Sequence, residues 1–518
     1  MASLRGDGDE GRDYLAKVGH LNVLPSRQNV LWNGGYLEGC LPSPGSLMPR
    51  GPLSLDTPQH MERQLASPQR MPSWGHVSAN GDAQLPLLGP GAPLDKARSD
   101  DGTGDLDERD TLSTPEAVFN LANTVLGVGV LSVPYAFRLS GYSTLLLVLL
   151  TIAVTSRTAG FIGEALVLAA RSPGAAAVPR KGRDFIFLAH VAFGPRGRAV
   201  IGAITSLEIW FALVTFMVMN GVNASLIWPG LGCSPAIIAS CVLAALTVFV
   251  PMRFFSYLSL VSSLSLAAAA VSMVGAALTM PSWANPYDHL GIPALLQLQN
   301  MPRSVGIIVF CFAGHPCFPV VHECMRDRGA WNSSVGITFL LAAAYYGGLG
   351  VFGYLVFGQD LAASFTMNLA QLQGTVLFRL ASAVAFLVKI QLTAPLLMNA
   401  IIVSFWAPAV GAPEWPPGRV LALAMLTVAT GLTASAFSND VAAVASLTGS
   451  LFTMTTSVIF PALVHLRLVE LFGARERRLR AELPHLLVLA FGFVMAIAGT
   501  ALTVRDLVGA RTRAGNAG

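Results

Sequence analysis

The chain has 518 residues, of which 53% are hydrophobic and 12% are charged, with a formal net charge of +4. Soluble domains carry roughly 25% charged residues, so this composition excludes an ordinary soluble protein. The small net charge does not indicate a nucleic-acid partner, and we expect none. The composition instead predicts an all-α protein embedded in a lipid bilayer.

Residues 1–113 form one compositional unit, rich in Gly, Pro, Ser, Arg and Asp and poor in aliphatic runs. Such a segment cannot bury enough apolar surface to fold, so we predict a disordered N-terminal tail. It has no charged start followed by an apolar core and a small-residue cleavage site, which a signal peptide would need. We therefore expect the tail to stay in the cytosol, where it is available to cytosolic partners.

Apolar runs of about 20 residues recur after residue 115, each long enough to cross roughly 30 Å of hydrocarbon. Residues 114–508 are predicted to form eleven membrane-spanning helices, and residues 509–518 a short C-terminal tail. The approximate ranges of the predicted spans are 116–137, 143–170, 197–227, 235–252, 257–280, 304–324, 334–357, 375–406, 419–437, 441–466 and 485–508.

Basic residues are concentrated in every second loop between these spans. With the N-terminal tail inside, the inner loops carry fifteen Lys and Arg residues and the outer loops about three. This bias predicts a cytosolic N-terminus. An odd number of spans then places the C-terminus on the other side, although Arg511 and Arg513 argue mildly against that.

The first predicted span is interrupted at its centre by Gly127-Val128-Gly129. Glycine lets the chain turn and lets a ligand approach the backbone closely. A helix that restarts beyond the break presents unpaired N–H groups and a positive dipole end, which suit a carboxylate. Asn123 and Thr124 add polar side chains just before the break. The alternative is that the glycines form a close helix-packing face.

The sixth predicted span is broken by Gly314-His315-Pro316, about ten residues from either end. An ionisable side chain at membrane depth is a functional hypothesis by default, and histidine changes charge near neutral pH. His315 is therefore a candidate proton carrier. Alternatively, a neutral His315 ring bonds a backbone carbonyl freed by the break and fixes its shape; the two roles do not exclude each other.

The breaks in the first and sixth spans together indicate an internal repeat. They predict five spans followed by five inverted ones, with the eleventh outside the repeat, because inverted repeats bring both breaks together at the midplane. Unwound backbone at membrane depth survives only where protein or a water-filled cavity satisfies its polar groups. The paired breaks therefore predict the substrate site of a secondary transporter.

Two further ionisable residues lie inside predicted spans. Lys389 is near the middle of the eighth, where its ammonium either occupies the place of a bound cation, carries a proton, or forms a structural ion pair. Glu208 in the third span either pairs with Lys389, relays protons, or is a satisfied buried polar group. We expect the run from Glu323 to Arg328 to form a solvated inner end of the sixth span.

Residues 120–137, with Gly-x-Gly and Pro-Tyr-Ala-Phe, and residues 312–369, with Gly314-His315, resemble the amino acid/auxin permease family. This family, also described as the amino acid transporter transmembrane family, includes vesicular inhibitory, lysosomal proton-coupled and plant vacuolar amino acid transporters. The stretch around Lys389 is similar to the plant and vacuolar branches. The resemblance covers about residues 114–508.

The resemblance implies a LeuT-type fold with broken helices 1 and 6, and amino acid transport driven by protons or sodium. It implies that the backbone at Gly127, Val128 and Gly129 holds the carboxylate and amino group of the substrate. The other implied substrate-binding residues are Asn123 and Thr124 on the same helix and Phe312, Ala313 and Gly314 opposite.

From these observations we expect a secondary active amino acid transporter that works by alternating access as a symporter or antiporter. Its expected coupling ion is the proton, with His315, Lys389 and Glu208 as candidate carriers. Sodium coupling is one alternative. An amino acid sensor that signals through the cytosolic tail is another.

We expect no enzymatic activity, because no nucleophile, metal cluster or phosphate-binding loop stands out in the sequence. No metal site or cofactor is expected apart from the co-transported ion. A vacuolar, lysosomal or other endomembrane is favoured as the location, with the plasma membrane as the alternative.

Overall fold

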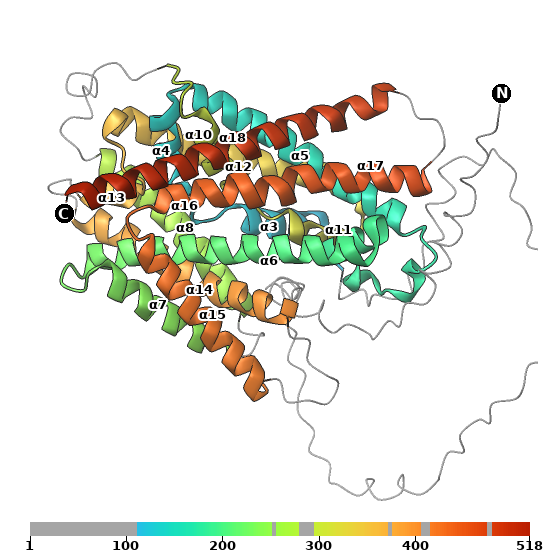
Figure 1. The fold of residues 1–518 in the computed structure, drawn as a ribbon, viewed down its shortest axis with the longest axis horizontal. Coiled ribbons are helices and arrows are strands. Elements are labelled where there is room, and N and C mark those ends of the chain that lie inside the picture. The colour runs from blue at the N-terminus through green and yellow to red at the C-terminus, as the bar shows by residue number, and fades with distance from the viewer. Residues whose placement is uncertain are drawn as a thin grey trace, which may run out of the picture. The chain divides into compact units, whose positions relative to one another are not determined.

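The computed structural model describes residues 111–250, 255–278, 295–370, 376–405, 415–473 and 479–517. Within these residues the chain is helical apart from its turns and one isolated parallel bridge between Leu112 and Met325 (Figure 1). Residues 1–110 of the predicted tail, which comprises residues 1–113, lie outside the described residues. Most of the predicted C-terminal tail, residues 509–518, continues the last helix as far as Ala517.

The helices match the eleven predicted spans in number and order. They are, in chain order, α3 (Thr114–Val125) with α4 (Val133–Ser140), α5 (Ser143–Ala169), α6 (Phe185–Ile227), α7 (Cys233–Thr247), α8 (Phe255–Leu278), α10 (Met301–Cys311) with α11 (Phe318–Cys324), α12 (Trp331–Phe357), α14 (Val376–Phe405), α15 (Pro417–Ala436), α16 (Val441–Leu447) with α17 (Phe460–Phe472), and α18 (Leu479–Ala517). Short helical turns and one π-helical segment complete the described chain: η2 (Val128–Leu131), η3 (Ala175–Ala177), η4 (Arg180–Gly182), η7 (His315–Cys317), η8 (Arg328–Ala330), η9 (Gly358–Asp360), α13 (Phe365–Ala370) and the π-helical η10 (Thr448–Ile459).

Length and hydropathy agree with a multi-pass membrane protein. Among the described residues, eight helices are long and apolar enough to cross a bilayer. A ninth span is the pair Thr114–Val125 and Gly129–Ser140, bent by 52°. Two shorter apolar helices, Cys233–Thr247 and Val261–Ala276, stand at the places of the predicted fourth and fifth spans.

Packing partners repeat with an offset of five segments. In the first half α6 packs on α7, and in the second half α14 packs on α15. α7 also contacts α14, as α15 contacts α6, and α8 packs on α14 as η10 packs on α6. α12 packs on α3 and α4 of the first span, as α5 packs on α10 and α11 of the sixth. The expected LeuT-type fold, with five plus five segments, an eleventh helix and breaks in segments one and six, is confirmed.

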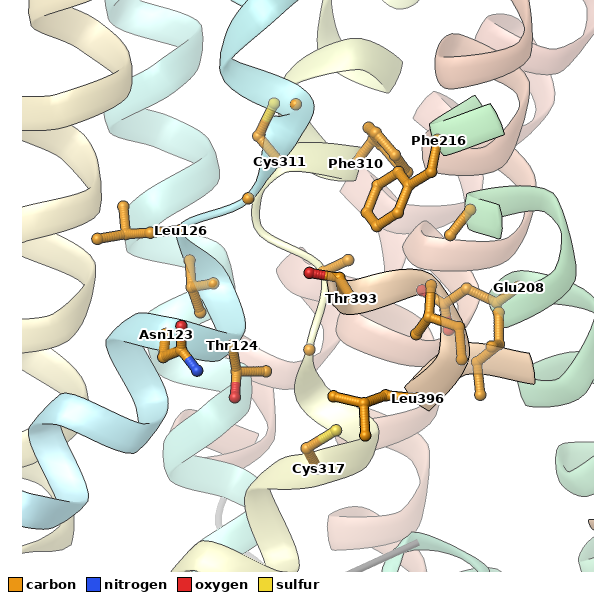
Figure 2. Close-up of a pocket in the computed structure, with 18 of the residues that line it drawn as sticks. Asn123, Thr124, Leu126, Glu208, Phe216, Phe310, Cys311, Cys317, Thr393 and Leu396 are labelled. Atoms are coloured by element: carbon orange, nitrogen blue, oxygen red, sulfur yellow. The ribbon is translucent and has the colours of Figure 1, made fainter. Parts of the chain in front are cut away.

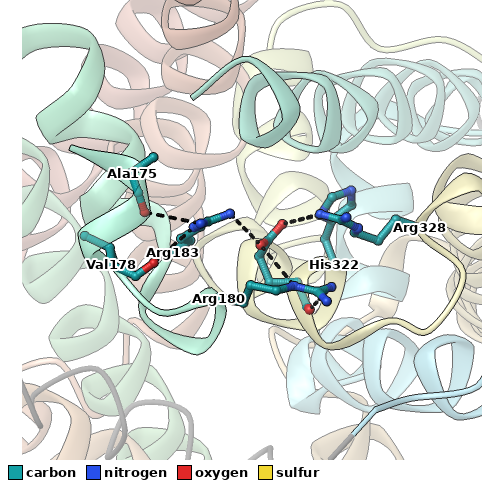
Figure 3. A network of polar contacts seen from close by, with 7 residues as sticks. Ala175, Val178, Arg180, Arg183, His322 and Arg328 are labelled. Atoms are coloured by element: carbon teal, nitrogen blue, oxygen red, sulfur yellow. Dashed lines mark hydrogen bonds and ion pairs between the residues drawn. The ribbon is translucent and has the colours of Figure 1, made fainter. Parts of the chain in front are cut away.

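The far end of the sixth segment is held by a buried charge cluster (Figure 3). The side chain of Glu323 is 2% exposed, with Arg180 at 3.8 Å, Arg183 at 3.7 Å, Arg328 at 3.8 Å and His322 at 3.1 Å from its oxygens. Burying a carboxylate costs several kcal/mol unless nearby cations and hydrogen bonds offset the loss of water. The expectation of a solvated end is therefore wrong for Glu323, because the loop between α5 and α6 folds over it.

The first and sixth segments are also joined at this end through backbone hydrogen bonds. The Leu112 N–H donates to the Cys324 carbonyl at 2.7 Å, and the Arg326 N–H donates to the Leu112 carbonyl at 2.9 Å. Directly afterwards, Ser113 and Glu116 form a capping box that starts α3. The residues just before the first segment are therefore bonded to the end of the sixth segment.

Candidate functional site

The first break lies between α3 and η2. α3 ends at Val125, Leu126 and Gly127 are extended, and the chain then turns through η2 into α4. Two backbone groups at the break bond one side chain: the Gly127 N–H donates to the Tyr346 hydroxyl at 2.8 Å, and that hydroxyl donates to the Val125 carbonyl at 2.8 Å. The break is therefore a defined structure rather than a frayed helix end.

The second break lies between α10 and η7. Gly314 has a φ of 137°, a conformation that side chains other than glycine rarely adopt. A Cβ at Gly314 would stand 2.7 Å from the Cγ2 of Thr124, on the helix that precedes the first break. A Cβ at Gly129 would stand 2.7 Å from the Sγ of Cys311. Glycine at these two positions therefore lets the two broken segments touch.

Gly127 plays a different part from Gly129. Its backbone is extended, with φ −128°, and a Cβ there would meet nothing within 4 Å. The close helix packing weighed as an alternative thus applies to Gly129. Gly127 instead leaves its side open toward the cavity.

A cavity of about 170 Å³ lies between the breaks and the helices α6, α12 and α14 (Figure 2). An apolar cavity of about 150 Å³ accommodates benzene, so the space suits a small organic molecule. In Figure 2, Asn123 and Thr124 lie on one side of the site and Glu208 on the other, with Thr393 between them. The predicted site residues that line the cavity are Asn123, Thr124, Gly127, Gly129, Glu208, Ala313, Gly314 and Lys389.

Two predicted residues, Phe312 and His315, do not line the cavity. Phe312 is fully buried and packs against Phe339 and Tyr346. His315 is also fully buried and is absent from the cavity lining. Val128 is the first residue of η2, and its side chain lies outside the described residues.

Glu208 and Lys389 are the charged residues of the cavity wall. Each side chain is 5% exposed. The Oε2 of Glu208 accepts a hydrogen bond from the Thr456 hydroxyl at 2.7 Å, while its Oε1 has no hydrogen-bond partner among the described residues. The Lys389 ammonium has no hydrogen bond or ion pair with a described residue, so the pairing with Glu208 that was one alternative is not formed. The Glu208 carboxyl group and the Lys389 ammonium group are therefore placed to interact with a molecule in the cavity.

His315 points toward α5 instead. Its Nε2 is 3.0 Å from the Thr155 carbonyl and 3.1 Å from the Thr158 hydroxyl. This contact corresponds to the structural role weighed for a neutral histidine, except that the carbonyl belongs to a neighbouring helix rather than to the break itself.

Sequence reasoning missed several members of the site. Tyr346 of α12, Phe216 of α6 and Thr393 of α14 all line the cavity. Tyr346 was visible only as part of the family resemblance, because a tyrosine in an apolar helix is ordinary. Phe216 looks like any other apolar helix residue. No local pattern distinguishes these residues from their neighbours.

Comparisons with known proteins identify a family. A family model described as transmembrane amino acid transporter protein matches residues 110–505. The amino acid transporter AVT1I of Arabidopsis thaliana is 25% identical over 417 residues, which cover 76% of this chain and 94% of that protein. The vesicular inhibitory amino acid transporter of Macaca fascicularis is 24% identical over 400 residues, 74% of this chain and 75% of that protein.

Two solved structures are also similar to this chain. MhsT in complex with L-phenylalanine matches with a TM-score of 0.45 and 12% identity, over 73% of this chain and 98% of that chain. A manganese transporter of Eremococcus coleocola matches with a TM-score of 0.46 and 13% identity, over 76% of this chain and 85% of that chain.

Proposed function

Because this chain belongs to the transmembrane amino acid transporter family, we propose that it is a proton-coupled secondary active transporter of amino acids. The observation that carries the proposal is the cavity between the two breaks, which combines non-helical backbone with Glu208 and Lys389, two ionisable groups that form no ion pair with each other or with another described residue. An amino acid offers a carboxylate and an ammonium, which match backbone N–H groups and carbonyls. The chain is not an enzyme, in keeping with its family.

The first break supports binding of the substrate carboxylate. Gly127 and Gly129 both line the cavity, and Gly127 has open space where a Cβ would lie. The first residues of a new helix have N–H groups without intrahelical partners. Ala313 and Gly314 form the opposite wall, where the chain is not helical and the Ala313 carbonyl is proposed to accept a hydrogen bond from the ammonium.

The charged wall supports proton coupling. Glu208 and Lys389 line the cavity, and both are able to exchange a proton with its contents. An ammonium fixed at Lys389 also takes the place that a sodium ion would need, which favours protons over sodium. Of the three candidate carriers, His315 has the weakest support, since it lies away from the cavity. Moving one charge through 100 mV supplies about 2.3 kcal/mol, enough for roughly 50-fold accumulation.

We further propose that the transporter alternates access by rearrangement of one repeat against the other around the paired breaks. The N-terminal tail is proposed to lie in the cytosol, on the basis of the basic inner loops. An endomembrane is the proposed location, because one relative of this chain is named a vesicular transporter.

Reconstitution tests the proposal directly. The purified protein in liposomes is given a panel of labelled amino acids, with an imposed pH gradient, an imposed sodium gradient, or neither. We expect concentrative uptake of at least one amino acid under the pH gradient alone. Protein-free liposomes with the same gradients provide the control.

Three other outcomes would each reject part of the proposal. Uptake driven by sodium and indifferent to pH would replace protons by sodium. Saturable binding without any flux would favour a sensor over a transporter. Neither binding nor flux for any amino acid would reject the site itself.

A further inference from the structure

We propose that Tyr346 and His315 are paired positioning residues, each of which holds one of the two breaks on the opposite half of the molecule. The inference rests on the proposed function, because it assigns to these residues the shape of the substrate site. It also gives His315 a role other than that of a proton carrier.

Tyr346 holds the first break. Its hydroxyl accepts a hydrogen bond from the Gly127 N–H and donates one to the Val125 carbonyl, both at 2.8 Å. A hydroxyl provides one donor and two acceptor lone pairs, so a single group serves both backbone atoms. The side chain is 1% exposed. Removing the hydroxyl leaves both backbone groups without this partner.

The ring of Tyr346 reaches the second break as well. It packs edge-to-face on Phe312, with ring centroids 5.4 Å apart. Phe312 is the C-cap residue that directly follows α10. One side chain of α12 therefore contacts the first break through its hydroxyl and the start of the second break through its ring.

His315 holds the second break through α5. The Thr155 carbonyl, 3.0 Å from Nε2, can only accept, so Nε2 carries the hydrogen. The Thr158 hydroxyl lies 3.1 Å from the same nitrogen, and its one hydrogen faces the Ser457 carbonyl at 2.7 Å and the Thr155 carbonyl at 2.9 Å. The ring lies against Phe318, with centroids 4.7 Å apart. Thr158 thus joins the second break to the tenth segment too.

The other ring nitrogen indicates a neutral imidazole. His315 Nδ1 is buried and has no hydrogen-bond partner among the described residues. A second proton on the ring would place an N–H group there without an acceptor, which is costly in a low-dielectric interior. His315 also does not line the cavity. The ring is therefore placed to bond α5 rather than to exchange protons with the substrate site.

The Tyr346 contact with the first break and the His315 contact with α5, here called the first and second anchors, occupy equivalent places in the two repeats. α12 is the second segment of the second half, and α5 is the second segment of the first half. Each break is therefore bonded to the helix that comes next after the other break. Inverted repeats place their breaks together at the midplane, and these contacts are a means by which each half fixes the backbone of the other.

Tyr346→Phe tests the first anchor, because it removes the hydroxyl and keeps the ring. Tyr345→Phe is the matched control: it lies on the same helix, does not line the cavity, and its hydroxyl contacts the Leu266 carbonyl at 3.4 Å. We expect Tyr346→Phe to raise the KM for uptake about 10-fold with little change in maximal rate. Tyr345→Phe should stay within about 2-fold of the unmodified chain, and the thermal stability of both variants in detergent shows whether they fold.

His315→Gln tests the second anchor, because the Gln amide can still donate toward the Thr155 carbonyl. We expect uptake by His315→Gln to keep the pH dependence of the unmodified chain. His315→Ala should raise the KM about 10-fold while the shape of its pH profile stays the same. Loss of gradient-driven accumulation in His315→Gln, with exchange preserved, would make His315 a carrier and overturn its positioning role.

A second readout does not depend on transport. Cys311 lines the cavity beside Gly129, so its reaction with a water-soluble thiol reagent reports on the packing of the breaks. In a chain whose other five cysteines are replaced by serine, Tyr346→Phe should speed Cys311 labelling several-fold, and Tyr345→Phe should not.

The two readouts separate the inference from the proposed function. If the unmodified chain transports nothing but Tyr346→Phe still speeds labelling, the proposed function fails and the anchor stands. If the unmodified chain transports amino acids and Tyr346→Phe matches Tyr345→Phe in both KM and labelling, the anchor is wrong and the proposed function stands.

Discussion

At the scale of single residues, Lys389 is the side chain whose position is hardest to explain by stability. A lysine at the centre of a membrane helix costs about 2.5–3.5 kcal/mol on insertion scales. Lys389 is 5% exposed and has no ion pair with a described residue that would offset this cost. Glu208 nearby in the cavity wall has an oxygen without a partner. Ionisable side chains without an ion-pair partner in a cavity wall indicate a functional role rather than a structural one.

Replacing either charge by its neutral isostere should separate binding from coupling. We expect Lys389→Gln and Glu208→Gln each to reduce accumulation under a pH gradient from up to about 50-fold to near equilibrium, while exchange of labelled for unlabelled amino acid persists. Arg467→Gln is the control, because Arg467 forms an exposed pair with Glu470, and such pairs contribute little. Full accumulation in both cavity variants would remove them as proton carriers.

At the scale of elements, the breaks depend on a few glycines, and for different reasons. Gly314 needs glycine for its φ of 137° and for its contact with Thr124. Gly129 needs it for the contact with Cys311, whereas Gly127 has space for a side chain. The sequence shows glycines at both breaks but does not say which of them is essential, since that depends on the facing segment.

Gly314→Ala should damage the second break specifically. A positive φ and a 2.7 Å contact together should cost about 1–3 kcal/mol of stability and abolish uptake. Gly336→Ala is the matched control, because Gly336 lies within α12 and a Cβ there meets nothing within 4 Å. It should be neutral or slightly stabilising, since alanine favours helix. Thermal unfolding and uptake measure both effects; equal behaviour of the two variants would contradict the assigned role of Gly314.

At the scale of the whole molecule, packing and sequence carry different information. The five-segment offset in packing establishes the repeat, but packing alone does not say which side of the molecule faces the cytosol. The basic loops supply that orientation as a prediction. An odd number of spans requires the two termini to lie on opposite sides.

Epitope tags at the two ends test the orientation. In sealed vesicles with the cytosolic face outward, we expect added protease to remove an N-terminal tag and to spare a C-terminal tag until detergent is added. Protection of the N-terminal tag would reverse the orientation. Cleavage of both tags in intact vesicles would mean that one of the eleven segments does not cross the bilayer.

The sequence by itself determined the membrane class, the order of the helices and the two breaks, because hydrophobicity, glycine and proline act over short stretches of chain. It also identified six of the cavity-lining residues beside the breaks, namely Asn123, Thr124, Gly127, Gly129, Ala313 and Gly314, because the glycines and polar residues at a break stand out in an apolar span. The resemblance in residues 120–137 and 312–369 added the family.

Only the tertiary structure decided which distant groups meet. The Tyr346 hydroxyl bonds Gly127 across 219 residues, and His315 bonds Thr158 across 157. The loop carrying Arg180 buries Glu323, which looks solvent-exposed in the sequence. The physical reason is that hydrogen bonds and ion pairs form between whichever groups packing brings within about 3–4 Å, and no periodicity along one segment specifies a partner on another.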